Sequence, residues 1–223
     1  MIGGHVIFRD RRDAGRRLGD TLSGLRGLRP VVLGLPRGGV PVAAEVARVL
    51  DAPLDVLVVR KIGAPSQPEF AVGALARGVI HLDPATLDQL GLSEPDLEAT
   101  IREEAEELER RESLYRGDRP PVPVRDRTVI VVDDGLATGQ TAMAALTLLR
   151  RMGARYLILA VPVGGPDTRA RMAGFADDVV CLSCPTDFHA VSEGYRDFSP
   201  TSDAEVLASL RASAPLAMDR GET

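Results

Sequence analysis

The sequence predicts an α/β fold: an open, mostly parallel, twisted sheet flanked by helices, with a long helical insertion and a small C-terminal hood. Short apolar runs rich in β-branched residues recur along the chain, as in Val31–Leu35, Leu54–Val59 and Val129–Val132. Such near-continuous hydrophobicity is typical of parallel strands that are buried on both faces. Segments with helical periodicity alternate with these runs, and glycine- or proline-containing turns separate them, which indicates α/β architecture.

The N-terminal part of the chain alternates between helical and strand patterns. Asp10 can cap a helix, because apolar residues recur at helical spacing behind it: Ala14, Leu18, Leu22 and Leu25. The expected elements that follow are, in order, the strand Val31–Leu35, the turn Pro36–Gly39, a helix over Val42–Leu50 and the strand Leu54–Val59. This order predicts a strand–turn–helix unit followed by a second parallel strand.

The middle of the chain departs from this regular alternation. Ile62–Phe70 contains glycine and two prolines, which predicts a loop, and Ala71–Ala76 with Val79–Leu82 should form a strand or hairpin. Ser93–Tyr115 is rich in Glu, Arg, Leu and Ala with alternating charge, so it predicts a long solvent-facing helix. We expect residues of about 84–117 to form a helical insertion.

The α/β pattern resumes after the proline-rich connector Arg119–Pro123. The expected elements are the strand Val129–Val132, the helix Gln140–Met152, the strand Tyr156–Val161, a short helix over Pro166–Ala173, the strand Val179–Leu182 and a short helix near Ala204–Leu210. We interpret residues 1–223 as a single domain, with a core of about 30–184 and a hood and tail of about 185–223.

Composition excludes several classes of protein. The net charge of −5 disfavours a sequence-independent nucleic-acid binder, which needs a basic face. The absence of a long apolar run and of a signal-peptide pattern predicts a cytoplasmic protein that has no membrane partner. Cys181 and Cys184 form a CxxC without a second ligand pair, so we expect ordinary buried thiols rather than a zinc or redox site.

Lysine is almost absent from the sequence. The 27 basic residues include a single lysine, Lys61, and all the others are arginine. A compact ammonium differs from a planar guanidinium as a phosphate partner, so a lysine that persists against such a bias is a candidate for a role that arginine cannot fill. Chance retention at a solvated position is the alternative.

The segment Val129–Thr141 carries the strongest functional signal. Val129–Val132 predicts a strand whose carboxyl end carries Asp133 and Asp134, at the edge where open α/β sheets bind ligands. The small residues and hydroxyls of Gly135–Thr141 then begin a helix, where free N–H groups favour a phosphate. Carboxylates accept hydrogen bonds from sugar hydroxyls, so the combination indicates a sugar phosphate. The pattern matches neither GxxxxGK[ST] nor GxGxxG.

Val129–Thr141 resembles the thirteen-residue signature of type I phosphoribosyltransferases, which binds phosphoribosyl pyrophosphate (PRPP). The resemblance implies that Asp133 and Asp134 hold the ribose hydroxyls and contact a metal ion only indirectly, through ribose or water. It also implies a 5′-phosphate loop formed by Ala137, Thr138, Gly139, Gln140 and Thr141. The order of elements agrees with this family over most of residues 31–183.

Two further segments fall where this family needs them. Pro36 and the PRPP-binding residues Arg37, Gly38 and Gly39 resemble the pyrophosphate loop, which often contains a cis non-proline peptide. Arg60 and Lys61 are similar to the Arg-Lys of adenine phosphoribosyltransferases, which meets pyrophosphate and opens a mobile catalytic loop. Closure of that loop would exclude water from the reacting centre, and Glu69, its one acidic residue, is a candidate for proton transfer.

The C-terminal segment resembles, more loosely, the hypoxanthine-type enzymes, in which a phenylalanine stacks on the purine. The corresponding base-binding candidates are Phe188, Tyr195 and Asp197, with His189 and Glu193 as partners for the edge of the base. The spacing of these residues departs from that of the hypoxanthine-type enzymes. For Phe188 a place in the hydrophobic core is the alternative.

The resemblance implies an Mg²⁺-dependent enzyme, a cytoplasmic homodimer of purine salvage, that moves a 5-phosphoribosyl group from PRPP to a nucleobase-like acceptor and releases pyrophosphate. Two alternatives remain open. One is a regulatory protein that senses PRPP or a nucleotide without turnover; Arg60, Lys61 and the glutamate-bearing loop favour an enzyme over it. The other is a PRPP synthetase, which the length of 223 residues disfavours because that enzyme has two such domains.

Overall fold

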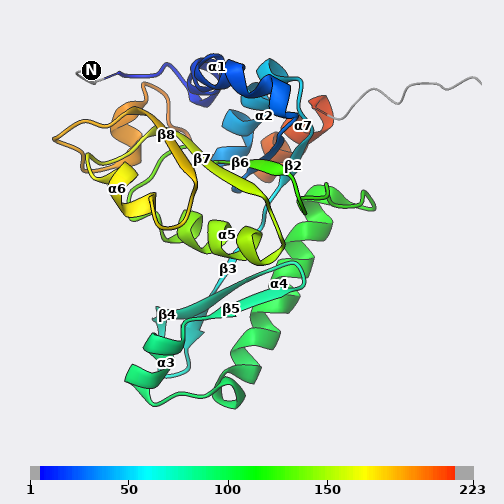
Figure 1. The fold of residues 1–223 in the computed structure, drawn as a ribbon, viewed down its shortest axis with the longest axis vertical. Helices are drawn as coiled ribbons and strands as arrows, with labels where there is room; N and C mark the ends of the chain where they lie inside the picture. Colours follow the sequence, from blue (N-terminus) through cyan, green and yellow to red (C-terminus); the bar gives the residue numbers. More distant parts are fainter. Residues whose placement is uncertain (1–5, 214–223) are drawn as a thin grey trace, which may run out of the picture.

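A five-stranded parallel sheet lies at the centre of the computed structural model, which describes residues 6–213. Its strands follow the order β2-β1-β6-β7-β8 (Figure 1). They are β1 (Val31–Gly34), β2 (Leu54–Val56), β6 (Thr128–Val132), β7 (Tyr156–Val163) and β8 (Asp178–Ser183). Each neighbouring pair is parallel, as in the pairing of Val32 with Ile130. The predicted fold class is therefore confirmed.

Helices cover both faces of this sheet, as the apolar strands require. One face is covered by α1 (Arg11–Leu22), α2 (Gly39–Leu50) and α7 (Asp203–Ala212), and the other by α5 (Gln140–Arg151) and α6 (Thr168–Met172). Alternate residues of one strand point to opposite faces, so Val32 packs with α1 and α2 while Val31 packs with α5. Asp10 caps α1 as predicted, through a 2.7 Å bond from the Asp13 amide.

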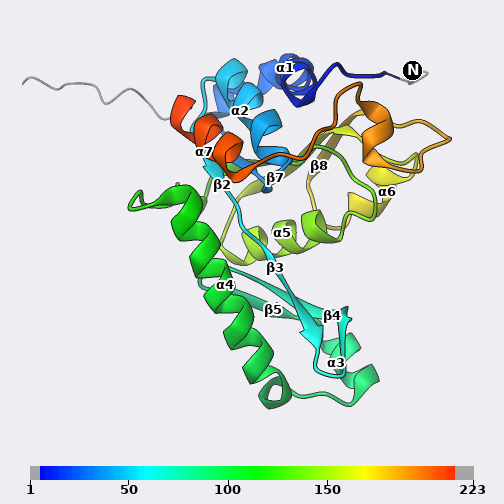
Figure 2. The same ribbon diagram turned by 180° about the vertical axis from the view of Figure 1, so that it is seen from behind.

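An arm extends away from the part of the molecule that contains the five-stranded sheet, and its strands and long helix lie side by side in both views (Figures 1 and 2). It consists of the antiparallel strands β3 (Arg60–Ala64), β4 (Gln67–Ala76) and β5 (Val79–Leu82), the short helix α3 (Pro84–Leu90) and the long helix α4 (Glu98–Arg116). The 3-10 turns η1 (Ser23–Leu28), η2 (Glu94–Leu97) and η3 (Val191–Gly194) complete the elements of the described residues.

The interpretation of Ile62–Phe70 as a loop was wrong. This segment forms most of a β3–β4 hairpin, with register irregularities on both sides of Gly63. A Cβ at Gly63 would lie 2.3 Å from the Pro68 carbonyl oxygen, so glycine permits the strands to approach closely here rather than ending them. Ile62 and Val72 are fully buried in the core cluster that includes residues of α4, and this tertiary packing outweighs the local glycine and proline signals.

The long helix also differs from its prediction as solvent-facing. Most of α4 is exposed, but its C-terminal half buries a stripe formed by Leu108, Glu112, Tyr115 and Arg116. Smaller differences are that Leu25 lies in η1 instead of α1, and that the strand predicted at Leu54–Val59 ends at Val56. Residues 214–223, the last part of the predicted tail, lie outside the described residues.

Candidate functional site

The acidic pair stands at the carboxyl end of β6, between β1 and β7. Asp133 and Asp134 are both partly buried, and the Asp133 Oδ1 atom accepts a 2.9 Å hydrogen bond from the Asp134 amide. Burial raises the pKa of Asp133 well above its ordinary value, and the neighbouring Asp134 carboxylate raises it further. Burial also raises the pKa of Asp134, against the lowering effect of the Arg11 guanidinium.

The glycine turn after β1 faces this pair directly. The Pro36–Arg37 peptide is cis, as the resemblance implied. A Cβ at Gly38 would lie 1.9 Å from Asp134 Oδ2, and one at Gly39 would lie 2.8 Å from the Asp133 Cα atom. Only residues without side chains permit this approach. The fold therefore places two segments about 95 residues apart in the chain against each other, with Arg37 exposed beside them, 4.0 Å from Asp203.

The predicted phosphate loop forms the start of α5. Gly139 is its N-cap residue and has a φ of 74°, a conformation that favours glycine. Ala137, Thr138, Gln140 and Thr141 are exposed there. The first amides of a helix have no partner within the helix, so this turn can bind an anion.

Arg171 of α6 supports the same loop, although no sequence pattern pointed to it. Its Nη2 donates to the Ala137 carbonyl at 3.0 Å and its Nη1 to the Thr138 carbonyl at 3.4 Å, while Asp167 pairs with its Nε at 3.3 Å. Its spacing of four residues from Asp167 was visible in the sequence, but its contact with the loop depends on how α6 packs.

Arg11 is a second site residue that sequence reasoning missed. Its Nε donates to Asp134 Oδ2 at 2.9 Å and its Nη1 to the Ser199 carbonyl at 2.7 Å. The guanidinium also lies 4.0 Å from the centre of the Phe198 ring. In the sequence Arg11 is one of several arginines on the polar side of α1, and nothing local distinguishes it from the others.

The predicted catalytic residues lie on the arm and make their ion pairs there. Arg60 Nε lies 2.6 Å from a carboxylate oxygen of Glu104 in α4. Lys61 Nζ lies 3.3 Å from a carboxylate oxygen of Glu69, which is fully exposed on the hairpin. The structure therefore brings Lys61 and Glu69 together, and it does not bring them into contact with the acidic pair.

Tyr195 lies under the acidic pair, in a position that differs from the one expected of a base-binding residue. Its ring is buried between Phe8 and Phe198, with centroid distances of 5.7 and 5.0 Å, and its hydroxyl donates to the Asp134 carbonyl. Burial raises its pKa, and the Asp134 charge raises it further. These contacts support the backbone of Asp134 and leave no open ring face for a base.

The other C-terminal candidates are more accessible. Phe188 is partly buried, and a Cβ at Gly165 would lie 3.5 Å from its ring. Asp197 accepts from the Ser199 hydroxyl at 2.7 Å and so closes a turn. Glu193 accepts from the His189 amide at 3.1 Å, while the His189 ring lies 3.0 Å from Asp187.

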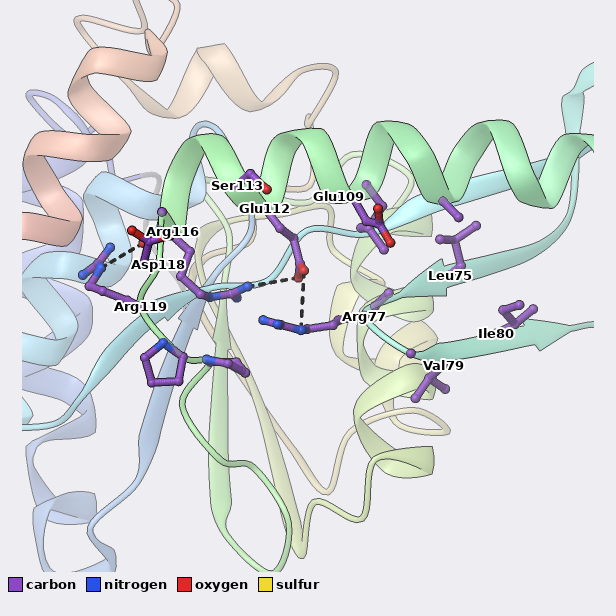
Figure 3. Close-up of a pocket in the computed structure, with 17 residues that line it drawn as sticks. Leu75, Arg77, Val79, Ile80, Glu109, Glu112, Ser113, Arg116, Asp118 and Arg119 are labelled. Carbon is purple, nitrogen blue, oxygen red and sulfur yellow. Dashed lines mark hydrogen bonds and ion pairs between the residues drawn. The ribbon is translucent and has the colours of Figure 1, made fainter.

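A pocket of about 760 Å³ lies elsewhere, between the C-terminal half of α4, the β4–β5 turn and the following connector (Figure 3). In it Glu112 lies between the guanidinium groups of Arg116 and Arg77, at 3.2 and 3.8 Å. Arg116 also pairs with buried Asp55 at 3.3 Å. None of the predicted site residues lines this pocket, and its central charges neutralise one another, so it is separate from the candidate site at the sheet edge.

The described residues contain no group of three or more His, Cys, Asp or Glu side chains that could by itself hold a metal ion. Cys181 is buried and Cys184 half-buried, and both are free thiols. No helix within residues 6–213 has the length and apolar character needed to cross a membrane.

A parallel α/β sheet whose carboxyl edge carries paired carboxylates, a helix start open to a phosphate and a facing glycine loop is typical of proteins that bind a sugar phosphate. Comparison with known proteins identifies the family. The chain belongs to the phosphoribosyl transferase domain family, whose model matches residues 12–197. This confirms the resemblance to type I phosphoribosyltransferases that Val129–Thr141 indicated.

Several relatives support this assignment. Two Mycobacterium tuberculosis proteins named as phosphoribosyl transferases, MT0597 and Rv0571c, are each 51% identical over 205 residues, which is 92% of this chain and 46% of theirs. The chain thus spans about half the length of these relatives. The crystal structure of TT1426 from Thermus thermophilus is 45% identical, with a TM-score of 0.85 over 94% of this chain and 100% of that one. A uracil phosphoribosyltransferase from Clostridioides difficile is 37% identical over 75 residues, 34% of this chain and 36% of that protein.

Proposed function

We propose that this protein transfers the 5-phosphoribosyl group of PRPP to a nucleobase and releases pyrophosphate. The observation that carries the proposal is the contact of the Pro36–Gly39 loop with the acidic pair. This contact is so close that a Cβ atom added at Gly38 would lie 1.9 Å from Asp134 Oδ2. A pyrophosphate group on that loop is next to a ribose on Asp133 and Asp134. The two parts of one donor are thereby bound on adjacent surfaces.

Each part of the donor has a chemically matched partner. The ribose hydroxyls donate to the Asp133 and Asp134 carboxylates, which are acceptors when ionised. The 5′-phosphate binds the free amides at the start of α5, in the loop Ala137–Thr141. The pyrophosphate binds the backbone amides of Arg37 and Gly38 together with the exposed Arg37 side chain. Pro36 has no N–H, and the Gly39 amide already donates to the Leu35 carbonyl at 3.0 Å. This orientation directs the C1 atom of the ribose toward the space between the two loops, where the acceptor attacks.

Mg²⁺ is the cofactor that we propose, and the acidic pair fits it as an indirect partner. Two adjacent, partly buried carboxylates attract a cation, and the pair is too small a set to enclose one. Mg²⁺ commonly keeps several waters and binds through one or two carboxylates together with substrate phosphates. When bound, it neutralises charge on the departing pyrophosphate.

The arm supplies further cations. Arg60 and Lys61 stabilise the negative charge that develops on pyrophosphate, after donor binding has drawn them from Glu104 and Glu69. Closure of the hairpin excludes water from the ribosyl centre, since water would otherwise hydrolyse the donor. Glu69, released from Lys61, is then available to accept a proton from the acceptor nitrogen.

A nucleobase is the acceptor that we propose, with a purine as the first candidate because of the likeness to adenine-type and hypoxanthine-type enzymes. Phe188 is the aromatic side chain best placed to stack on it, since Tyr195 is enclosed by Phe8 and Phe198. The short match to a uracil phosphoribosyltransferase makes uracil a necessary member of any substrate panel.

The test is to incubate the protein with labelled PRPP, Mg²⁺ and a panel of purine and pyrimidine bases, and to measure pyrophosphate release. Release that depends on one base, with formation of the matching nucleotide, supports the transferase. Saturable PRPP binding without turnover across the panel supports the sensing protein instead. Absence of PRPP binding by calorimetry contradicts both.

Two expectations concern the protein in its cell. We propose that it acts in the cytoplasm as a homodimer, as the family resemblance implies. Sedimentation equilibrium would test the dimer, with a mass of about twice the 23.8 kDa of the chain as the expected result. Cell fractionation would test the location.

A further inference from the structure

We propose that Arg11 is a positioning residue for the donor, which acts by holding the Asp134 carboxylate in the orientation that accepts the ribose. This inference rests on the proposed function, in which Asp134 binds the ribose of PRPP. Arg11 belongs to α1, and the chain separates it from Asp134 by 123 residues. The role therefore arises from the packing of α1 beside the sheet edge.

Three contacts fix the Arg11 guanidinium. Its Nε donates to Asp134 Oδ2 at 2.9 Å, its Nη1 donates to the Ser199 carbonyl at 2.7 Å, and its Cζ atom lies 4.0 Å from the centroid of the Phe198 ring. Its side chain is only 12% exposed. A guanidinium with its donors directed in this way has little freedom, so its bond to the carboxylate is directional as well as charged.

Asp134 is restricted on several sides by Arg11 and by two other residues. Its Oδ2 atom receives the Arg11 bond, and its main-chain carbonyl accepts from the Tyr195 hydroxyl. Gly38 closes the third side, since a Cβ there would lie 1.9 Å from Oδ2 and 3.3 Å from Arg11 Nε. Among residues 6–213 no protein donor bonds Oδ1 of Asp134, so this oxygen is the one that remains for a sugar hydroxyl.

Direct binding of the donor by Arg11 is the competing role, and its geometry argues against it. A residue that binds phosphate needs an exposed guanidinium with free donors, whereas the Arg11 side chain is nearly buried and two of its nitrogens are already bonded. Arg11 also lies just outside residues 12–197, the part matched by the family model, as do Phe198 and Ser199. The contacts of Arg11 with Phe198 and Ser199 thus extend to a carboxylate that lies within the matched part of the chain.

A double-mutant cycle tests whether Arg11 acts through Asp134. The variants are Arg11→Met, Asp134→Asn and their combination, and calorimetry measures the affinity of each folded protein for PRPP with Mg²⁺. Each single change is expected to weaken binding about 10- to 100-fold, as for loss of a hydrogen bond to a charged group. The double variant should be about as weak as the weaker single variant, because both changes remove the same interaction. Turnover at saturating PRPP should fall less than the affinity.

Arg16→Met is the matched control. Arg16 lies on the same helix, is 39% exposed and reaches Glu45 at 3.8 Å, so its loss should leave PRPP affinity unchanged. Arg11→Lys serves as the conservative variant if Arg11→Met does not fold; it keeps the charge but loses the paired donors, and an intermediate affinity is expected. Thermal unfolding of every variant separates a loss of folding from a loss of binding.

The outcomes distinguish the inference from the proposed function. If Asp134→Asn weakens binding while Arg11→Met and Arg11→Lys bind PRPP as the wild type does, the role of Arg11 is refuted and the function stands. Independent effects that multiply in the double variant also refute it. If Asp134→Asn binds PRPP normally, the ribose site itself is wrong, and the inference fails together with it.

Discussion

Replacement of Gly38 by alanine is the most direct test of the site geometry. The backbone there has φ −62° and ψ −34°, which alanine adopts without strain, so the change acts through the added methyl group alone. That carbon would lie 1.9 Å from Asp134 Oδ2 and 2.6 Å from Asp134 Cγ. Ordinary contact begins near 3.4 Å, so the carboxylate has to move by about 1.5 Å.

A displacement of this size removes two features at once. The 2.9 Å bond from Arg11 to Asp134 is lost, and the carboxylate leaves the position that we assign to the ribose. A misplacement of about 1 Å in a site can cost about 10²-fold, and a lost hydrogen bond to a charged group costs about 1.5–3 kcal/mol. We therefore expect PRPP affinity to fall about 100-fold, which corresponds to about 2.7 kcal/mol.

Calorimetry with PRPP and Mg²⁺ measures this loss, and urea unfolding checks that the fold persists. Gly24→Ala is the matched control, because a methyl group at Gly24 would have nothing within 4 Å. It should leave PRPP affinity as in the wild type. A folded Gly38→Ala protein with wild-type affinity would refute the reasoning, since it would show that the glycine loop and Asp134 do not meet at the donor.

The remaining predictions concern the buried charges, the thiol pair and the lone lysine. Arg116→Met should lower the free energy of unfolding by about 3–5 kcal/mol, because it leaves the buried Asp55 carboxylate without its cation. Arg110→Met, at an exposed ion pair, should change this free energy by less than about 1 kcal/mol. A urea titration that finds the two variants equally stable would contradict a stabilising role for the Arg116–Asp55 pair. The neighbouring Cys181 side chain lowers the pKa of Cys184 to about 7 from its ordinary value of 9.0, so alkylation of Cys184 by iodoacetamide should reach half its maximal rate near pH 7 and fall below that pH. A midpoint near 9 would show that Cys181 has no such effect. Lys61→Ala should strongly lower turnover with almost no change in stability, since its partner Glu69 is fully exposed; an unchanged rate with the accepted base would exclude Lys61 from the reaction.

The predictable features of this protein are those that neighbouring residues encode. The run Val129–Val132 is apolar at every position, so both faces of β6 had to be buried, and the structure buries them. The placement of Asp133 and Asp134 at the carboxyl end of that strand follows from chain order alone. The glycine loop could be assigned to the same edge because β1 and β6 are parallel, which brings their carboxyl ends together.

Other features were misread or missed because packing overrides the local signal. Gly63 and the prolines beside it are typical of a loop, yet burial of Ile62 against α4 makes the segment a hairpin. Tyr195 was a base-binding candidate because its segment loosely resembles that of the hypoxanthine-type enzymes, whereas in the structure Phe8, from the other end of the chain, packs against its ring. Arg11 resembled any arginine on an exposed helix face.

The class of fold, the sugar-phosphate motif and the family to which that motif points could all be inferred from the sequence alone. Periodicity and turn chemistry act over a few residues, so they can be read without knowing what each element touches. Which side chains meet follows from the folded chain: Arg11 and Tyr195 contact Asp134, Arg171 contacts the predicted phosphate loop, and Lys61 contacts Glu69. Except for the last pair, which closes a hairpin, these contacts join distant segments, and they exist because burial of the apolar faces brings those segments together.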